Sequence, residues 1–199
     1  MLQVHLENKF LEAVLLIESI DTRDWLKAEL MLEELLLGEL HYFLKVDVLI
    51  NLCELLMKEA SAFNDTTAFK KTSKYLKELH KLAVTNEIPF LTVESLWLQA
   101  KLALFSFEVE KPQKLISEAL EIATEKGLER LQKKLLEEKE NITTIISLLI
   151  KKDNEAIPLS GQMEIIGIES TFKEVKKQRI FNTREEEPIL NKKMFVLKL

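Results

Sequence analysis

Turn-forming residues and cysteine are scarce in this sequence of 199 residues. It contains four glycines and four prolines, whereas average usage would give roughly 14 and 10 in a chain of this length. Because glycine and proline form turns and end helices, so few of them indicate few turns and long elements. Cys53 is the single cysteine, so no intramolecular disulfide can form, and a reducing, cytoplasmic compartment is predicted.

Long apolar runs and an excess of basic residues are also absent. No apolar run approaches the roughly 20 residues that a membrane-spanning helix requires. The opening "MLQVHLENKF" has neither the basic flank nor the apolar core of a signal peptide. The formal net charge is -5, which argues against a general nucleic-acid binder, since such a protein needs a basic face. We therefore expect neither a membrane nor a nucleic acid as a partner.

The residue patterns of common catalytic and metal sites are missing as well. His5, His41 and His80 lie far apart, and none has a second histidine or cysteine at metal-ligand spacing. The glycine motifs that bind phosphates and the G-x-S-x-G motif of hydrolases do not occur. Cys53 lies within an apolar stripe, where a packed, inert thiol is expected rather than a nucleophile. We expect no catalytic residue, no metal and no cofactor.

Helix-forming residues dominate what is present. Leucine, glutamate and lysine are the most frequent residues, and apolar side chains recur at spacings of three and four. This periodicity predicts helices over about 6–20, 22–38, 41–60, 66–85, 91–107, 110–126 and 128–151. Asp21 or Thr22 is expected to cap the second helix, and Gly127 to close the sixth in the left-handed conformation. The predicted fold class is all-α, built from antiparallel helix hairpins.

The character of the sequence changes after residue 151. The stretch "KKDNEAIPLSGQ" is polar and contains Pro158 and Gly161, which predicts a linker. A weaker helix is predicted over about 162–180, and the final "MFVLKL" would suit a short strand. The predicted organisation is a helical domain over 1–151, with about three helix pairs and a capping helix, followed by a C-terminal tail over 152–199.

Small residues recur at equivalent positions of the predicted helices. Ala13, Cys53 and Ala100 align in the first, third and fifth helices, with an uneven period of about 40 residues. Two helices per unit at such a period are typical of a helical-repeat array. Ala119 and Ala123 lie one turn apart in the sixth helix. Because small residues let two helix axes approach closely, we expect a neighbouring helix to cross there.

The stretch "LWLQAKLALFSFEVEKPQKLISEALEIATEKGL", residues 96–128, resembles a tetratricopeptide-type repeat. In that family a small residue stands midway along the first helix, where this chain has Ala100. Two small residues seven apart mark the second helix, here Pro112 and Ala119, and the large residue between them is Ile116. The glycine usual in the inter-helix turn is replaced, and the units are longer than the family's length of about 34 residues.

The resemblance extends over residues 6–150 and implies a right-handed solenoid, whose first helices line a concave groove for protein or peptide segments. Carried over residue by residue, the groove positions are Asp47, Ile50, Glu54, Met57, Glu94, Trp97, Lys101, Leu104 and Phe105. Such a groove is mixed apolar and acidic with one lysine, and it would suit an amphipathic helix or a basic, extended segment. For Trp97, core packing is expected ahead of ligand contact.

These patterns leave three functions open. The first is a non-catalytic protein–protein interaction module, a scaffold or adaptor that binds a protein segment in the groove. The second is a regulatory or sensory part of a larger signalling system, whose C-terminal tail docks on the groove as an autoinhibitory segment. A tail that instead covers an apolar end would prevent self-association. The third, and least favoured, is a helical enzyme whose site forms only in three dimensions.

Overall fold

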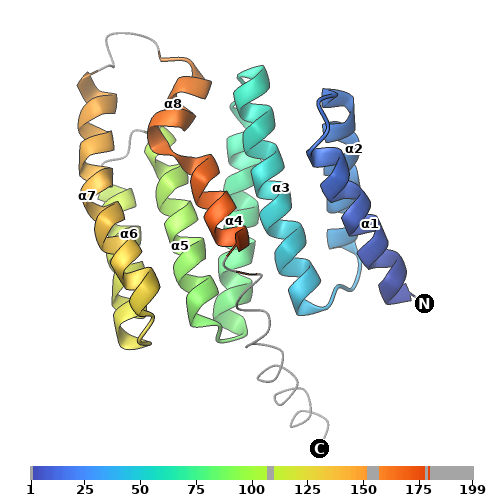
Figure 1. The fold of residues 1–199 in the computed structure, drawn as a ribbon, viewed down its shortest axis with the longest axis horizontal. Helices are drawn as coiled ribbons and strands as arrows, with labels where there is room; N and C mark the ends of the chain where they lie inside the picture. Colours follow the sequence, from blue (N-terminus) through green and yellow to red (C-terminus); the bar gives the residue numbers. More distant parts are fainter. Residues whose placement is uncertain (1, 107–109, 152–156, 178, 180–199) are drawn as a thin grey trace, which may run out of the picture.

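A computed structural model describes residues 2–106, 110–151, 157–177 and 179 of the chain (Figure 1). Every element within these residues is a helix, which confirms the all-α fold class, and the predicted strand over 194–199 lies outside them. The elements are α1 (Leu2–Ile17), α2 (Thr22–Leu37), α3 (Tyr42–Phe63), α4 (Thr67–Thr85), α5 (Pro89–Ala103), the short 3-10 helix η1 (Leu104–Ser106), α6 (Glu110–Glu125), α7 (Glu129–Lys151) and α8 (Leu159–Ile166).

Consecutive helices pack against each other along the chain. The helices α1 and α2, α3 and α4, and α5 and α6 form antiparallel hairpins, and α2–α3, α4–α5 and α6–α7 contacts join each hairpin to the next element. In Figure 1 the helices α1, α3, α5 and α7 stand in one layer, with α2, α4 and α6 behind them. Each hairpin therefore buries its apolar side against its neighbours, as layered helical domains must.

Several helix ends lie where the sequence places them. The Asp21 carboxylate caps α2 by accepting a hydrogen bond from the backbone N–H of Arg23 at 2.9 Å. Gly127 follows α6 with a φ of 66°, the left-handed conformation that glycine adopts without strain. Pro89 is the first residue of α5, two positions before the predicted start, because its missing N–H costs nothing there.

The end of the first helix was predicted wrongly. The helix α1 ends at Ile17, three residues before the predicted end, and Ile20 is 99% exposed. The polar residues that follow explain the early end. The Ser19 hydroxyl donates to Asp24 at 2.7 Å, and the backbone N–H of Asp21 donates to the Ser19 hydroxyl at 3.1 Å. These bonds hold the chain in a turn that begins α2, so the helix cannot continue through Ile20.

The small residues of the repeat pattern are all in the core. Their exposed fraction is 0% at each position: Ala13, Cys53, Ala100, Ala119 and Ala123. The last two lie on α6, which packs against both α5 and α7. Methyl groups at these positions let neighbouring helices approach closely, whereas a leucine would overpack the crossing.

The helix α3 is buried around nearly its whole circumference. Its buried residues include the polar Asn51 and Glu54 as well as apolar side chains. The reason is its central position, since α3 contacts α1, α2, α4 and α8. A helix with neighbours on every side leaves no face for solvent, whatever its sequence period indicates.

Residues 157–177 and 179, called here the C-terminal segment, form a third layer. The segment lies in front of the layer that contains α3, α5 and α7 (Figure 1). The helix predicted over 162–180 is present in two pieces, α8 and a helix over 168–177, and they are separated by Gly167 with a φ of 67°. Six apolar side chains of the segment join the main core: Leu159, Met163, Ile166, Ile168, Phe172 and Val175.

Candidate functional site: the inner face and the segment that covers it

The C-terminal segment covers one side of α3, α5 and α7, called here the inner face. All the predicted groove positions lie on α3, on α5 or on η1 directly after it. As whole residues, seven of them are at most 5% exposed: Ile50, Glu54, Met57, Glu94, Trp97, Lys101 and Leu104. The side chain of Asp47 is 38% exposed, and Phe105 is partly buried. Most of these positions are therefore closed to solvent in this structure.

Two ion pairs join the C-terminal segment to α3. Lys176 Nζ lies 2.7 Å from Glu54 Oε2, and Arg179 Nε lies 2.7 Å from Asp47 Oδ1. The side chains of Glu54 and Arg179 are only 7% and 5% exposed. Each pair therefore has one buried partner, and a buried charge that loses its counter-ion is costly. Two of the predicted groove positions thus bind basic residues of the chain itself.

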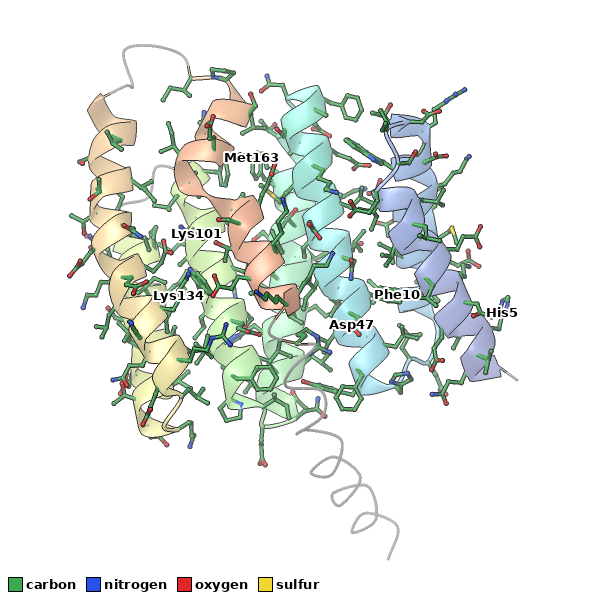
Figure 2. All side chains as sticks on the ribbon, in the orientation of Figure 1. His5, Phe10, Asp47, Lys101, Lys134 and Met163 are labelled. Atoms are coloured by element: carbon green, nitrogen blue, oxygen red, sulfur yellow. The ribbon has the colours of Figure 1, made fainter. Side chains whose placement is uncertain are left out.

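Lys101 connects three elements at the centre of the inner face. It lies on α5, and its Nζ donates a hydrogen bond to the carbonyl oxygen of Ile166 at 2.8 Å. That carbonyl belongs to the last turn of α8, where backbone oxygens have no partner within the helix. The same ammonium pairs with the carboxylate of Glu138 on α7, and both side chains are almost fully buried. Figure 2 labels Lys101 together with Asp47 of α3 and Lys134 of α7.

A third ion pair ties the C-terminal segment to α7. Lys134 Nζ lies 2.9 Å from Glu174 Oε2 and 6.0 Å from the centre of the Trp97 ring. The segment therefore presents basic residues to α3 and an acidic residue to α7. This complementarity fixes which edge of the segment faces which helix.

A pocket of about 370 Å³ remains between α5, α7 and the C-terminal segment. Its lining includes Trp97, Lys101, Lys134, Glu138, Thr171 and Glu174. Trp97 is 1% exposed, so the expected core packing is observed, yet its Nε1–H has no hydrogen-bond acceptor among the described residues. The pocket thus has a lining of mixed charge beside the buried Trp97.

Phe105 does not point to the inner face. Its ring lies 4.6 Å from the ring of Phe69 on α4, centre to centre, and so it packs toward the second layer. The cause is the change from α-helix to 3-10 helix at Leu104, which alters the direction of the following side chains.

The residues of the inner face that sequence reasoning missed lie on α7 and in the C-terminal segment: Lys134, Glu138, Glu174, Lys176 and Arg179. Lys176 and Arg179 stand in a strongly charged stretch, which by itself favours a solvated tail over a docking segment. The regular spacing of the buried apolar residues after Pro158 was the signal that indicated a packed helix instead.

A separate charged cluster lies between α2, α3 and α4. Lys71 of α4 pairs with the carboxylates of Glu29 and Glu33, and the Tyr75 hydroxyl donates to Glu33 at 2.8 Å. Burial, and then the nearby charge of Glu29, raise the pKa of Glu59 to about 7. The Glu59 carboxyl is therefore partly protonated near neutral pH in the folded chain.

Glu59 gives a pH-dependent term to stability. Because its folded pKa lies above its ordinary value of 4.5, the folded state binds more protons than the unfolded state between these two values. The contribution of Glu59 to the free energy of unfolding is therefore favourable at low pH, where the carboxyl is protonated, and it is lost as the pH rises toward 7. We expect Glu59→Gln to raise the free energy of unfolding at pH 8, with a gain that shrinks toward pH 5. Urea unfolding at several pH values measures this, and a gain independent of pH would contradict it.

Exposed apolar side chains are frequent on the first hairpin. Among the described residues, seven exposed large apolar side chains come from positions 4 to 37: Val4, Leu11, Leu15, Ile20, Leu26, Leu30 and Leu37. Leu30 and Leu37 also line a hollow of about 610 Å³ between α2 and α4. Exposed apolar side chains beside such a hollow often mark a contact surface.

The remaining observations exclude some kinds of site within the part of the chain that the structure describes. No helix there is long and apolar enough to cross a membrane. In the same residues, no three or more histidine, cysteine or acidic side chains are grouped so as to hold a metal ion. Cys53 is fully buried, and its burial raises the pKa of the thiol. No family model, no curated protein and no solved structure matches this chain.

Proposed function

We propose that this chain is a non-catalytic protein–protein interaction module, in which the inner face binds a segment of another protein. One observation carries the proposal. The chain's own C-terminal segment already lies on this face as a helix, with apolar side chains in the core and ion pairs to α3 and α7. A face that accepts one amphipathic helix has the shape and charge to accept another.

The wider assignment rests on the tetratricopeptide-type resemblance. In this proposal the hairpins form a right-handed, tetratricopeptide-like solenoid that acts as a scaffold or adaptor in the cytoplasm. The buried small residues and the pairwise packing of consecutive helices support it, because repeat arrays bury a continuous core in this way. The exposed apolar residues of the first hairpin are a further contact surface, through which the chain self-associates or binds a neighbouring domain.

Site-specific photocrosslinking tests where partners bind. A benzophenone side chain is placed at Thr144, an exposed position of α7 that lines the pocket at the inner face. The matched control carries it at Glu118, an exposed position of α6 in the other layer. We expect crosslinks to other proteins from position 144 and few from position 118. Equal or reversed labelling would overturn the assignment of the inner face.

A second candidate is a regulatory part of a larger signalling system. The observation that favours it is again the seated C-terminal segment, because a segment that occupies a binding face is autoinhibitory if partners need that face. The two candidates differ in one measurable respect. In a constitutive scaffold the partner itself displaces the segment, so partners are captured without any signal. In a regulated module, capture requires a signal that first releases the segment.

A further inference from the structure

The buried side chains of the C-terminal segment follow one spacing twice. In each of its two helices the apolar residues stand at positions i, i+4 and i+7. The two triads are Leu159, Met163 and Ile166, and then Ile168, Phe172 and Val175. This spacing places three side chains on one side of a helix, the arrangement by which an amphipathic helix fills an apolar groove.

Charged residues of the segment fix its direction on the inner face. Lys176 pairs with Glu54, and Arg179, further along the segment, pairs with Asp47, which comes earlier on α3. The segment therefore runs antiparallel to α3. On its other edge, Glu174 pairs with Lys134 of α7. The inner face thus recognises two basic residues. They stand one and four positions after Val175, the last apolar residue of the second triad.

We propose that the external partner of the inner face is a basic amphipathic helix with this same pattern, and that it binds by displacing the C-terminal segment. Numbered from the first residue of the triad, the partner carries apolar side chains at i, i+4 and i+7 and basic side chains at i+8 and i+11. This inference rests on the proposed function, since it names the partner class of the same face.

The structure of the segment favours reversible docking on the inner face. Gly167 divides it into α8, which has eight residues, and the helix over 168–177. Helices of this length are not stable in water by themselves, so the segment is helical only while it is docked. A continuous partner helix without a glycine loses less conformational entropy on binding than the C-terminal segment loses on docking. The covalent link gives the segment a high effective concentration, which the partner must overcome.

A peptide of residues 157–180, labelled with fluorescein, is the probe, and fluorescence anisotropy against the full chain is the readout. The variant K176E/R179E loses both ion pairs to α3, so its own segment is docked less of the time. Because occupancy by the segment lowers the apparent affinity for a competitor, this variant is expected to bind the peptide about tenfold more tightly than the wild-type chain.

Matched variants separate the ion pairs from general charge. Lys173 and Lys177 are exposed on the same helix, and K173E/K177E makes the same change in net charge, so it is expected to bind the peptide as the wild type does. The variant D47K/E54K reverses the charge of the face. It is expected to prefer a peptide carrying K176E/R179E over the wild-type peptide, by about tenfold. Circular dichroism spectra and cooperative thermal unfolding are checked first for each variant.

A second measurement uses only the wild-type chain, so it does not depend on how the variants fold. An excess of the same peptide is added, built from ¹³C- and ¹⁵N-labelled amino acids so that its fragments differ in mass from those of the chain. Hydrogen exchange is then followed at the amides of residues 159–177 of the full chain by mass spectrometry. Displacement is expected to speed their exchange, while α3 and α5 stay protected. Unchanged exchange in the segment, or equal peptide affinity for the wild type and for K176E/R179E, would overturn the inference. Inner-face crosslinks to other proteins would still support the proposed function in that case.

Discussion

Replacing Lys101 by methionine is expected to lower the free energy of unfolding by about 3–5 kcal/mol. The variant leaves the carboxylate of Glu138, whose side chain is 7% exposed, as a buried charge without its cation. It also removes the hydrogen-bond donor to the Ile166 carbonyl at the end of α8. Urea denaturation followed by circular dichroism measures the loss.

The pair itself is tested by a double variant. K101M/E138L replaces both charges by apolar side chains, so no buried charge is left alone, and we expect most of the lost stability to return. The surface control is Lys114→Met. Lys114 pairs with Glu110 across one turn of α6, but both side chains are about four-fifths exposed, and its removal is expected to change stability by less than about 0.5 kcal/mol. If Lys101→Met lowers the free energy of unfolding as little as Lys114→Met does, Lys101 does not form a buried connection between α5, α7 and α8.

Phe172→Ala is expected to remove the C-terminal segment from the inner face. Phe172 is completely buried, and truncation of a core phenylalanine costs about 3–5 kcal/mol. Because the segment forms an outer layer on the hairpins, we expect the lost stability to appear as local undocking of the segment. Hydrogen exchange is expected to become fast at residues 159–177 while α3 to α6 remain protected.

Local undocking also predicts how further substitutions combine. Once the segment is undocked, Ile168→Ala adds no further loss to Phe172→Ala, because neither side chain is packed any longer. The control is Leu136→Ala on α7, where the side chain is 52% exposed and little change is expected. Simultaneous loss of protection throughout the chain would show instead that the segment and the hairpins form one cooperative unit.

Local features of the fold were predictable because they depend on neighbours in the sequence. The cap at Asp21 and the left-handed Gly127 follow from the chemistry of single side chains. The burial of Ala100 and Ala119 follows from the helical period. The end of α1 was predicted wrongly because the apolar residues keep their helical spacing as far as Ile20. The hydrogen bonds of Ser19 form a turn there and end the helix earlier.

The inner face was predictable only in part. Asp47, Glu54 and Lys101 were assigned to it, and all three contact the C-terminal segment. Phe105 was assigned there as well, but it packs on Phe69 of α4. The end of α5 explains this miss, because the chain changes there to a 3-10 helix that apolar spacing does not reveal.

The sequence by itself determined that this chain is helical, where most of its helices end and which small residues are buried, because helix propensity, capping and periodicity act over a few residues. The tertiary structure alone decided that the C-terminal segment lies on α3, α5 and α7, and that α3 is enclosed on nearly every side. The two ion pairs between the segment and α3 join residues more than 120 positions apart, as in Lys176 and Glu54. An apolar stripe shows that a helix packs against something. Which element it packs against depends on complementary shape and charge, and these come together only when the whole chain has folded.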